Sequence, residues 1–481
     1  MPSGITAFGT HIPYWRLTGE TVSDALGAGP KKNARCVAGF DEDTTTMALE
    51  AARAALAETD RSRIASLTLA TGSPTYGAKT NATAVHAALG LPATTSAMDV
   101  GGAERSGLAA LINAMRLPGD NLVVLSDVGV GPAGSSDEVG LGDGAAAFVV
   151  GTEDGGAPAV ELLARASVTE EFLDRWKAPG EAFASTWEER FGQDIYHRLG
   201  VESAAAALAQ AGLEAGQISA HVCTGLSARA VRSVVRAVGA AGVAAEDLTS
   251  RIGRLGVAHA GVALIDAIES AQGGDVIALT LLADGAETLI LRVTDTGGAG
   301  QAVNVRAQVA AGNDGLRYTD FLNWKGLLEK LGPRRPAPSR ATAPPSHREL
   351  SWKFGFRADV CTSCGTRNLP PQRVCLRCGA VDAMEQVAMA DVPGTIATFT
   401  IDHLAFSPAP PVIGVVIDFD GGGRFQCQLT DADPDQVAIG QRVIMTFRVM
   451  SEAAGISNYF WKARPLLGAD ETPAPIGRDG K

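Results

Sequence analysis

The sequence predicts a layered α/β domain followed by a small metal-binding ribbon and a small β-barrel. Three observations carry this prediction. Apolar strand-like runs alternate with Ala-rich helical patterns over the first part of the chain, a Pro-rich stretch interrupts it after residue 331, and paired cysteines and short β-rich segments fill the rest. A chain of 481 residues is long enough for roughly two to four folding units.

The α/β prediction rests on the order and character of the elements. Each apolar run is followed by a Gly, Asp or Ser that can open a helix, and the runs are apolar enough for burial on both faces of a sheet. We therefore expect a core sheet sandwiched between helices. The expected strands are 67–72, 121–127, 145–151 and 275–285, and the expected helices are 44–58, 80–89, 104–116, 202–213, 227–240 and 258–271.

Composition excludes several classes of function. The net charge of -12 opposes binding that depends on phosphate-backbone contacts, because such surfaces need clustered Lys and Arg. No stretch approaches the roughly 20 apolar residues of a membrane-spanning helix, and the first residues lack the basic start and apolar run of a signal peptide. We expect a cytoplasmic protein with neither a nucleic-acid partner nor a membrane partner.

A change in composition marks a linker. The stretch 332–346, GPRRPAPSRATAPPS, combines five prolines with three arginines and small polar residues, which leaves nothing to pack in a core. The expected domains are an α/β domain at 1–331, the linker at 332–350, the ribbon at 351–383, the barrel at 384–467 and a C-terminal tail at 468–481.

Four of the seven cysteines form the most specific motif in the chain. Cys361 with Cys364 and Cys375 with Cys378 make two CxxC pairs, each followed by a glycine that lets the backbone turn tightly around an ion. In a reducing compartment this spacing indicates a metal site rather than disulfides. Four thiolates close the coordination sphere, which predicts structural zinc. A rubredoxin-like iron site would use the same spacing, but nothing else indicates electron transfer.

The C-terminal region resembles a known pairing of domains. Four β-rich segments separated by Pro, Gly and Asp turns, at 394–401, 412–419, 423–431 and 441–450, predict a barrel of four or five strands. Together with the cysteine motif, they resemble the DUF35-type proteins, in which a rubredoxin-like zinc ribbon and an OB-fold barrel accompany thiolase-like enzymes. OB folds often bind nucleic acid, and arginines surround the cysteines. The acidic chain argues against that alternative, and the same cations equally suit the phosphates of coenzyme A.

Residues 3–297 resemble hydroxymethylglutaryl-CoA synthase and its bacterial and archaeal relatives in the thiolase superfamily. The match is distributed over many segments, among them GITAFGTHIPYWRL (4–17), FDEDTTTMALEAARAAL (40–56), MDVGGAERSGLAALINAM (98–115) and RIGRLGVAHAGVALIDAIESAQGGDVIAL (251–279). The resemblance implies a thiolase-like fold of αβαβα layers and an acyl-CoA substrate. Thiolase-superfamily domains usually pair through a central strand, so we also expect a homodimer.

Two of the three catalytic groups that the resemblance implies are replaced. The family's nucleophilic Cys, at a helix start where the dipole lowers its pKa, corresponds to Glu104 in DVGGAERSG. The general-base Glu corresponds to Gly72 in ATGS, and the catalytic His corresponds to His221 in SAHVCTG. We expect Glu104 to stay ionised as a base or as an electrostatic brake on acyl transfer, unless it is only a surface partner of the helix dipole. We expect His221 to stabilise an oxyanion, unless it is a core histidine.

Further site residues follow from the same resemblance. Tyr76 in SPTYGAK and His259 in GVAHAGVA fall in loops or helix starts that line the pocket of the resembled fold, and the alternative for both is packing. Gly285 in ADGAE is expected to let the backbone approach the substrate closely. Cys223 is the only thiol near a motif, and on a strand it would face the same side as His221.

Three functions remain open at this stage. The first is aldol-type cleavage or formation of a carbon–carbon bond in a 3-hydroxyacyl-CoA, which needs an oxyanion hole and a base but no acyl-enzyme. Thiolase-like proteins with zinc-ribbon OB partners include such aldolases in steroid breakdown, which favours this hypothesis. The second is a synthase-like condensing or acyl-transfer enzyme in which another group replaces the Cys. The third is a degenerate fold that binds acyl-CoA or acts as a scaffold.

Overall fold

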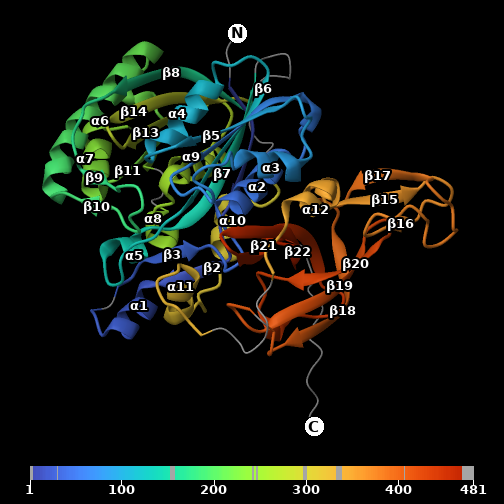
Figure 1. Cartoon of the computed structure of the whole chain (residues 1–481). Coiled ribbons are helices and arrows are strands. Elements are labelled where there is room, and N and C mark those ends of the chain that lie inside the picture. Colours follow the sequence, from blue (N-terminus) through green and yellow to red (C-terminus); the bar gives the residue numbers. More distant parts are fainter. Residues whose placement is uncertain are drawn as a thin grey trace. The chain divides into compact units, whose positions relative to one another are not determined.

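The computed structural model describes residues 4–29, 31–151, 158–240, 243–244, 248–295, 301–331, 339–405 and 407–468. The chain forms two compact units (Figure 1). Unit 1 consists of Met1–Ala38, Asp43–Thr83 and Leu91–Tyr318, and unit 2 consists of Gly39–Glu42, Ala84–Gly90 and Thr319–Lys481. Unit 2 therefore includes a four-residue segment from the N-terminal part of the sequence.

Unit 1 is built on one mixed sheet. Within the described residues the strand order is β12-β11-β13-β14-β8-β1-β7-β6-β4-β5. Two short pairs lie outside this sheet, β2 with β3 and β9 with β10. The strands are β1 Gly4–His11, β2 Trp15–Thr18, β3 Ala34–Val37, β4 Ile64–Thr71, β5 Ser96–Gly101, β6 Asp120–Val128, β7 Asp143–Gly151, β8 Val160–Val168, β9 Arg175–Trp176, β10 Ser185–Thr186, β11 Ala220–Gly225, β12 Val243–Ala244, β13 Val276–Leu282 and β14 Ala286–Val293.

The sheet consists of two halves joined by a short seam. β1 pairs with β7 from Gly4 to His11, but it meets β8 only through Gly4 with Glu161 and Ile5 with Val160. In one half β4 runs parallel to β5 and β6, and in the other β11 runs parallel to β13. Parallel neighbours need helical crossovers, which explains the alternation of strands and helices in the sequence.

Helices cover the sheet and fill its centre. The side chains of α2 are almost all buried, as are those of α9 from His259 to Ile268. On the outside, α6 packs on β8 and β14, and α7 packs on α6 and β11 (Figure 1). The helices of unit 1 are α1 Gly19–Leu26, α2 Thr44–Ala55, α4 Arg105–Ala114, α5 Ser136–Gly140, α6 Glu189–Ala211, α7 Ala228–Val238, α8 Thr249–Ile252, α9 His259–Ser270 and α10 Val305–Ala310. Four further helices belong wholly or mostly to unit 2: α3 Ala82–Leu89, α11 Tyr318–Trp324, α12 Ala343–Arg348 and α13 Leu350–Lys353.

Unit 2 contains a ribbon and a closed barrel. The ribbon is a small sheet of order β16-β15-β17, and the barrel has the order β18-β19-β20-β22-β21. Phe447 and Trp461 lie in the barrel interior with no exposed surface. The strands are β15 Arg357–Cys361, β16 Arg367–Asn368, β17 Met384–Ala388, β18 Gly394–Asp402, β19 Val412–Phe419, β20 Arg424–Leu429, β21 Arg442–Ala453 and β22 Ile456–Pro465.

The predicted fold class is confirmed, with differences at the boundaries. The layered α/β unit, the ribbon and the barrel are all present. Helix α12 lies inside the stretch expected to be a linker, because Pro is tolerated in the first turn of a helix, and Pro344 and Pro345 lie near the start of this one. Residues 332–338 of that stretch and the expected tail beyond 468 lie outside the described residues. No helix among the described residues is long and apolar enough to cross a membrane.

Candidate active site

A cavity of about 380 Å³ lies in unit 1 between strand β11 and helices α7, α8 and α9. This volume suits a small organic ligand. Apolar side chains from α7 and from Leu248, just before α8, line it together with three arginines. The lining residues that bear on chemistry are His221, Cys223, Arg232, Arg236, Arg254 and His259. Strand β11 therefore brings the predicted histidine and the predicted thiol to one wall, as their spacing of two residues requires.

His221 is buried and uncharged at neutral pH. Burial lowers the pKa of its ring from the ordinary 6.5 to about 4. Its Nε2 lies 3.1 Å from Thr280 Oγ1 on the neighbouring strand β13, whereas Nδ1 is buried without a hydrogen-bond partner among the described residues. A row of hydroxyls, Ser203, Thr288 and Thr280, leads to Nε2. The ring is thus held through Nε2, and Nδ1 is the ring atom left to bond a ligand.

Glu104 forms the N-terminal cap position of α4, but its carboxylate does not bond the helix N–H groups. It accepts a hydrogen bond of 3.0 Å from Arg254 Nε instead, and the two side chains are only 13% and 15% exposed. Burial raises the pKa of Glu104, and the Arg254 guanidinium opposes this rise. We expected the helix to keep Glu104 ionised. In the structure the Arg254 guanidinium opposes protonation of Glu104, and Arg254 is a residue that the sequence did not single out.

A second carboxyl group occupies the space in front of Gly72. A Cβ atom on Gly72 would lie 3.1 Å from Asp127 Oδ2, so a side chain at position 72 and the Asp127 carboxylate would compete for this space. Asp127, on β6, accepts hydrogen bonds from the N–H of Val257 at 3.1 Å and from the hydroxyl of Ser73. Burial raises the pKa of Asp127, and its charge in turn contributes to the raised pKa of Glu104. The two carboxyl groups therefore interact.

Cys223 and His259 share the cavity with His221. Burial raises the pKa of the Cys223 thiol to about 12, so the thiol is protonated at neutral pH. His259 begins helix α9, where its Nδ1 accepts from the N–H of Leu255 at 3.4 Å and its Nε2 lies 3.3 Å from Thr249 Oγ1. Burial therefore acts against the thiolate form that a thiolate–imidazole pair would need.

Tyr76 and Gly285 are not among the residues that line this cavity. Tyr76 sits in the loop after β4, where its backbone exchanges hydrogen bonds with the side chain of Asn81. Gly285 forms the turn between β13 and β14 with φ +118°. A Cβ there would lie 2.5 Å from the carbonyl oxygen of Val168, which explains the glycine by packing. The substrate contacts expected for both residues stay predictions.

The four paired cysteines converge in the ribbon of unit 2. All four Sγ atoms lie within 4.8 Å of one another, and the Cys361–Cys378 and Cys364–Cys375 pairs are 3.7 Å and 3.6 Å apart. A tetrahedral ion with bonds of about 2.3 Å to sulfur separates its ligands by about 3.8 Å, so the cluster fits such an ion. Gly365 and Gly379 have φ of +71° and +74°, which confirms the tight turns expected after each pair.

Known proteins resemble unit 1 in both sequence and fold. The hydroxymethylglutaryl-CoA synthases of Picrophilus torridus and Methanosphaera stadtmanae are 29% and 28% identical over 210 and 214 residues, which cover 41% of this chain and 59% and 61% of the synthases. The solved structure of MvaS in complex with 3-hydroxy-3-methylglutaryl coenzyme A matches with a TM-score of 0.57 at 20% identity, over 70% of this chain and 95% of that chain. Unit 1 is a thiolase-superfamily, hydroxymethylglutaryl-CoA synthase-like domain. The match nevertheless spans only about three fifths of the length of these synthases.

The same fold occurs in 3-oxoacyl-(acyl carrier protein) synthase III, FabH, from Pseudomonas aeruginosa PAO1. That structure matches with a TM-score of 0.53 at 21% identity, over 61% of this chain and 99% of that chain. At such identity the likeness establishes the fold of the synthase-like domain alone. The four proteins named for this domain are hydroxymethylglutaryl-CoA synthases, MvaS and a 3-oxoacyl-(acyl carrier protein) synthase, so the comparisons favour the synthase-like alternative over the aldol reaction that we expected first.

Unit 2 has relatives of its own. A family model described as the C-terminal OB-fold domain of ChsH2 matches residues 386–448. A DUF35 domain-containing scaffold protein of Methanocaldococcus jannaschii is 28% identical over 126 residues, which cover 25% of this chain and 89% of that protein. The chain thus joins a synthase-like domain to a DUF35-type region with an OB fold and a four-cysteine cluster.

Proposed function

We propose that the synthase-like domain makes or breaks a carbon–carbon bond in an acyl-CoA thioester without forming a covalent acyl-enzyme. The observation that carries this proposal is the ion pair between Glu104 and Arg254 at the start of α4, the position that corresponds to the family's nucleophilic Cys. A carboxylate there cannot hold an acyl group as a thioester, but it can take and return a proton.

His221 supplies the electrophilic side of the proposed reaction. Because its lowered pKa keeps the ring neutral, one ring nitrogen carries a proton and the other accepts. A ring N–H directed at the thioester oxygen stabilises the negative charge that develops as the α-carbon becomes enolate-like. The hydroxyl row that ends at Thr280 fixes the orientation of the ring.

Glu104 is the proposed acid–base group. In cleavage Glu104 takes the proton of the β-hydroxyl of a 3-hydroxyacyl-CoA. The Cα–Cβ bond then breaks, and the electron pair of that bond passes into the thioester enolate. The β-carbon leaves as an aldehyde or ketone, and protonation of the enolate gives a shortened acyl-CoA. The reverse sequence is an aldol addition. The raised pKa of Glu104 favours this role because proton transfer is most efficient when the pKa approaches the working pH. His259 lines the cavity and is the alternative base, and Tyr76 remains a weaker one.

The arginines of the cavity suit the coenzyme A part of such a substrate. Arg232 and Arg236 both lie on α7 and line the cavity together with apolar side chains. Guanidinium groups bind phosphates through charge-assisted hydrogen bonds, while the apolar wall suits an acyl or pantetheine chain. We propose that these two arginines hold the phosphates.

A synthase-like condensing or acyl-transfer reaction is the second candidate. It is favoured by the relatives named above, among them MvaS in complex with 3-hydroxy-3-methylglutaryl coenzyme A. It requires a nucleophile other than Glu104, and Cys223 is the thiol that lines the cavity. Its raised pKa of about 12 opposes that role. Acyl-CoA binding without turnover, as a scaffold, is the third candidate, in line with the scaffold name of the relatives of unit 2.

Product analysis on a thioester panel separates these functions. Purified full-length protein is incubated with 3-hydroxyacyl-CoA and 3-oxoacyl-CoA thioesters, and products are followed by mass spectrometry with Glu104→Gln and His221→Gln alongside. We expect a carbonyl product and a shortened acyl-CoA without consumption of free coenzyme A, and losses of about 10²–10³ in kcat for His221→Gln. Cleavage that depends on free coenzyme A would favour acyl transfer, and binding without turnover would favour the scaffold.

We further propose that the cysteine cluster holds structural zinc and that the synthase-like domain forms a homodimer. Four thiolates leave no open coordination position, so zinc there contributes to folding rather than catalysis. Strand β5 is an edge of the sheet, and its Met98 is 45% exposed. Pairing of two such edges would satisfy their free backbone groups. Light scattering behind a sizing column tests this, and a monomeric mass would reject the dimer.

A further inference from the structure

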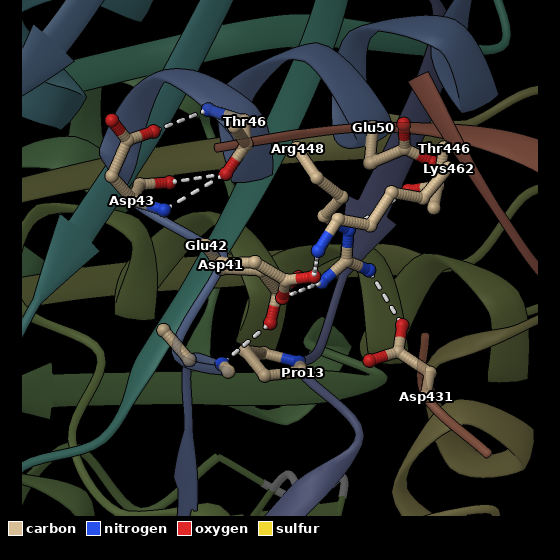
Figure 2. Close-up of polar contacts among 12 residues, drawn as sticks. Pro13, Asp41, Glu42, Asp43, Thr46, Glu50, Asp431, Thr446, Arg448 and Lys462 are labelled. Carbon is tan, nitrogen blue, oxygen red and sulfur yellow. Dashed lines mark hydrogen bonds and ion pairs between the residues drawn. The ribbon is translucent and has the colours of Figure 1, made fainter. Parts of the chain in front are cut away.

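Two buried cations lie side by side in the barrel of unit 2. Arg448 on β21 has no exposed side-chain surface, and Lys462 on β22 has 3%. Figure 2 shows the Arg448 guanidinium with carboxylates on either side, Asp41 and Glu42 on one and Asp431 on the other. Arg448 lies 2.9 Å from Glu42 and 2.5 Å from Asp431, and Lys462 Nζ lies 2.8 Å from Asp41 Oδ2. Cations at this depth are stable only when they are paired.

Most of the negative charge in this cluster comes from a distant segment of the sequence. Of the three carboxylates, only Asp431 belongs to the barrel sequence, whereas Asp41 and Glu42 belong to the segment Gly39–Glu42. The barrel holds this segment by its backbone as well, since the N–H of Val449 donates to the carbonyl of Asp41 at 2.9 Å. Lys462 Nζ also lies 4.9 Å from the ring centre of Phe40. Without the segment Gly39–Glu42, Asp431 would be the one of these three carboxylates left beside the buried Arg448 and Lys462.

The other ion pairs of the barrel differ in kind. Arg424 and Asp418 are 2.6 Å apart, but their side chains are 65% and 49% exposed. Such surface pairs contribute about 0–1 kcal/mol, because solvent screens them. The ion pairs of Arg448 and Lys462 are buried, so solvent does not screen them in this way.

The segment Gly39–Glu42 continues directly into helix α2, whose start bonds the turn beside Asp127. The next residue, Asp43, caps helix α2 and accepts a hydrogen bond of 3.0 Å from Thr75 Oγ1. Thr44 Oγ1 donates to the carbonyl of Ser73 at 3.0 Å, and the hydroxyl of Ser73 donates to Asp127. The start of α2 therefore fixes the turn that follows β4, and this turn bonds the carboxylate that interacts with Glu104.

We propose that Arg448 and Lys462 are positioning residues: they bind the acidic segment Gly39–Glu42 and, through it, set the start of α2 and the Ser73–Thr75 turn. The barrel then serves the reaction as an ordering element for the synthase-like domain, in addition to its own fold. The effect on turnover rests on the proposed function, whereas the binding of the segment does not.

A double-mutant cycle on the full-length, metal-loaded protein tests this proposal. The variants are Asp41→Asn, Lys462→Met and the double variant, with Arg424→Met as the matched control in the exposed pair. Hydrogen exchange is measured in peptides that cover residues 39–50 and 71–78. We expect each single variant to speed exchange there by about tenfold. The double variant should speed exchange by less than the two single effects combined, because it removes both members of the Asp41–Lys462 pair and strands neither. The control should leave these peptides unchanged.

Kinetics separate positioning from a general loss of stability. We expect a lower kcat per folded molecule with a nearly unchanged KM in the single variants, and partial recovery in the double variant. Unchanged exchange in both segments, or additive effects in the cycle, would overturn the positioning proposal even if the enzyme is active. If no acyl-CoA is turned over, the proposed function fails and the exchange cycle still decides the binding of the segment. If the single variants do not fold, a folded double variant supports the pairing and an unfolded one overturns it.

Discussion

Glu104 accepts a hydrogen bond from Arg254 across 150 residues of sequence. Glu104 is also the residue that we matched, from the sequence, to the nucleophile of the resembled synthases. The carboxyl group is buried enough for its pKa to rise, and the guanidinium limits that rise. Arg254 is therefore the neighbouring charge that most opposes protonation of Glu104. This interaction makes the proposed acid–base role accessible to measurement.

Replacement of Arg254 should move the pH profile. In Arg254→Met the positive charge is lost, so the pKa of Glu104 rises further and more of the carboxyl group is protonated at a given pH. We expect the acid limb of kcat/KM to shift to higher pH, with a loss of about tenfold or more on that limb. Arg232→Met, which alters another cavity arginine, should change KM without this shift. An acid limb that stays in place would remove Glu104 from the role of base.

His221 should make the fold sensitive to acid. Its pKa is about 4 in the folded protein against an ordinary 6.5, so the unfolded chain binds this proton more readily. Above pH 6.5 the ring is neutral in both states and does not lower the free energy of unfolding. As the pH falls from 6.5 toward 4, protonation of the unfolded chain lowers the free energy of unfolding, and the loss reaches about 3 kcal/mol near pH 4. Denaturant unfolding of the wild type and of His221→Gln at several pH values measures it. Equal slopes of stability against pH in both proteins would contradict the buried neutral ring.

Cys223 should be dispensable for catalysis. Because burial raises the pKa of the thiol to about 12, it is almost wholly protonated at pH 7 and reacts slowly with alkylating agents. We expect Cys223→Ser to keep kcat within a few-fold of wild type and iodoacetamide to leave activity intact. Rapid inactivation that is absent in Cys223→Ser would restore the acyl-transfer reading.

Loss of the metal should unfold the ribbon. The four cysteines fit one tetrahedral ion, and removal of that ion leaves a small sheet with little core of its own. We expect one zinc per chain by elemental analysis, and its loss in Cys361→Ser with Cys364→Ser, accompanied by proteolysis within 357–388. Binding of the metal by thiolates should also weaken in acid, since protons compete for sulfur. A metal-free protein with a protease-resistant ribbon would contradict the structural role.

The elements that the sequence predicted best are those whose signal is local. The Ala-rich and apolar patterns marked α2, α4, α7 and α9 to within a few residues, and the spacing of the cysteines marked their cluster. Helix α6 begins at Glu189 rather than 202, because its first turns carry polar and aromatic residues without the Ala-rich pattern. Strand β22 was missed for a similar reason, since Lys462 and Arg464 interrupt its apolar alternation.

Long-range pairings were beyond the reach of the sequence. Arg254 lies in the segment 251–279, which resembles the synthases, yet nothing local in that segment indicates a partner at Glu104. The same holds for Arg448 and Asp41, which in sequence are an ordinary strand cation and an ordinary loop carboxylate. Their burial, which gives each pair its importance, is a property of the fold alone.

The mass of the intact protein during turnover tests the central claim most directly. Full-length protein is mixed with a 3-hydroxyacyl-CoA that it converts, quenched in acid during the steady state, and weighed, with Glu104→Gln alongside. We predict product formation that depends on Glu104 and a protein mass that never changes by an acyl group. A transient acyl adduct on the wild-type protein, on Cys223 or elsewhere, would contradict the non-covalent mechanism and establish acyl transfer in its place.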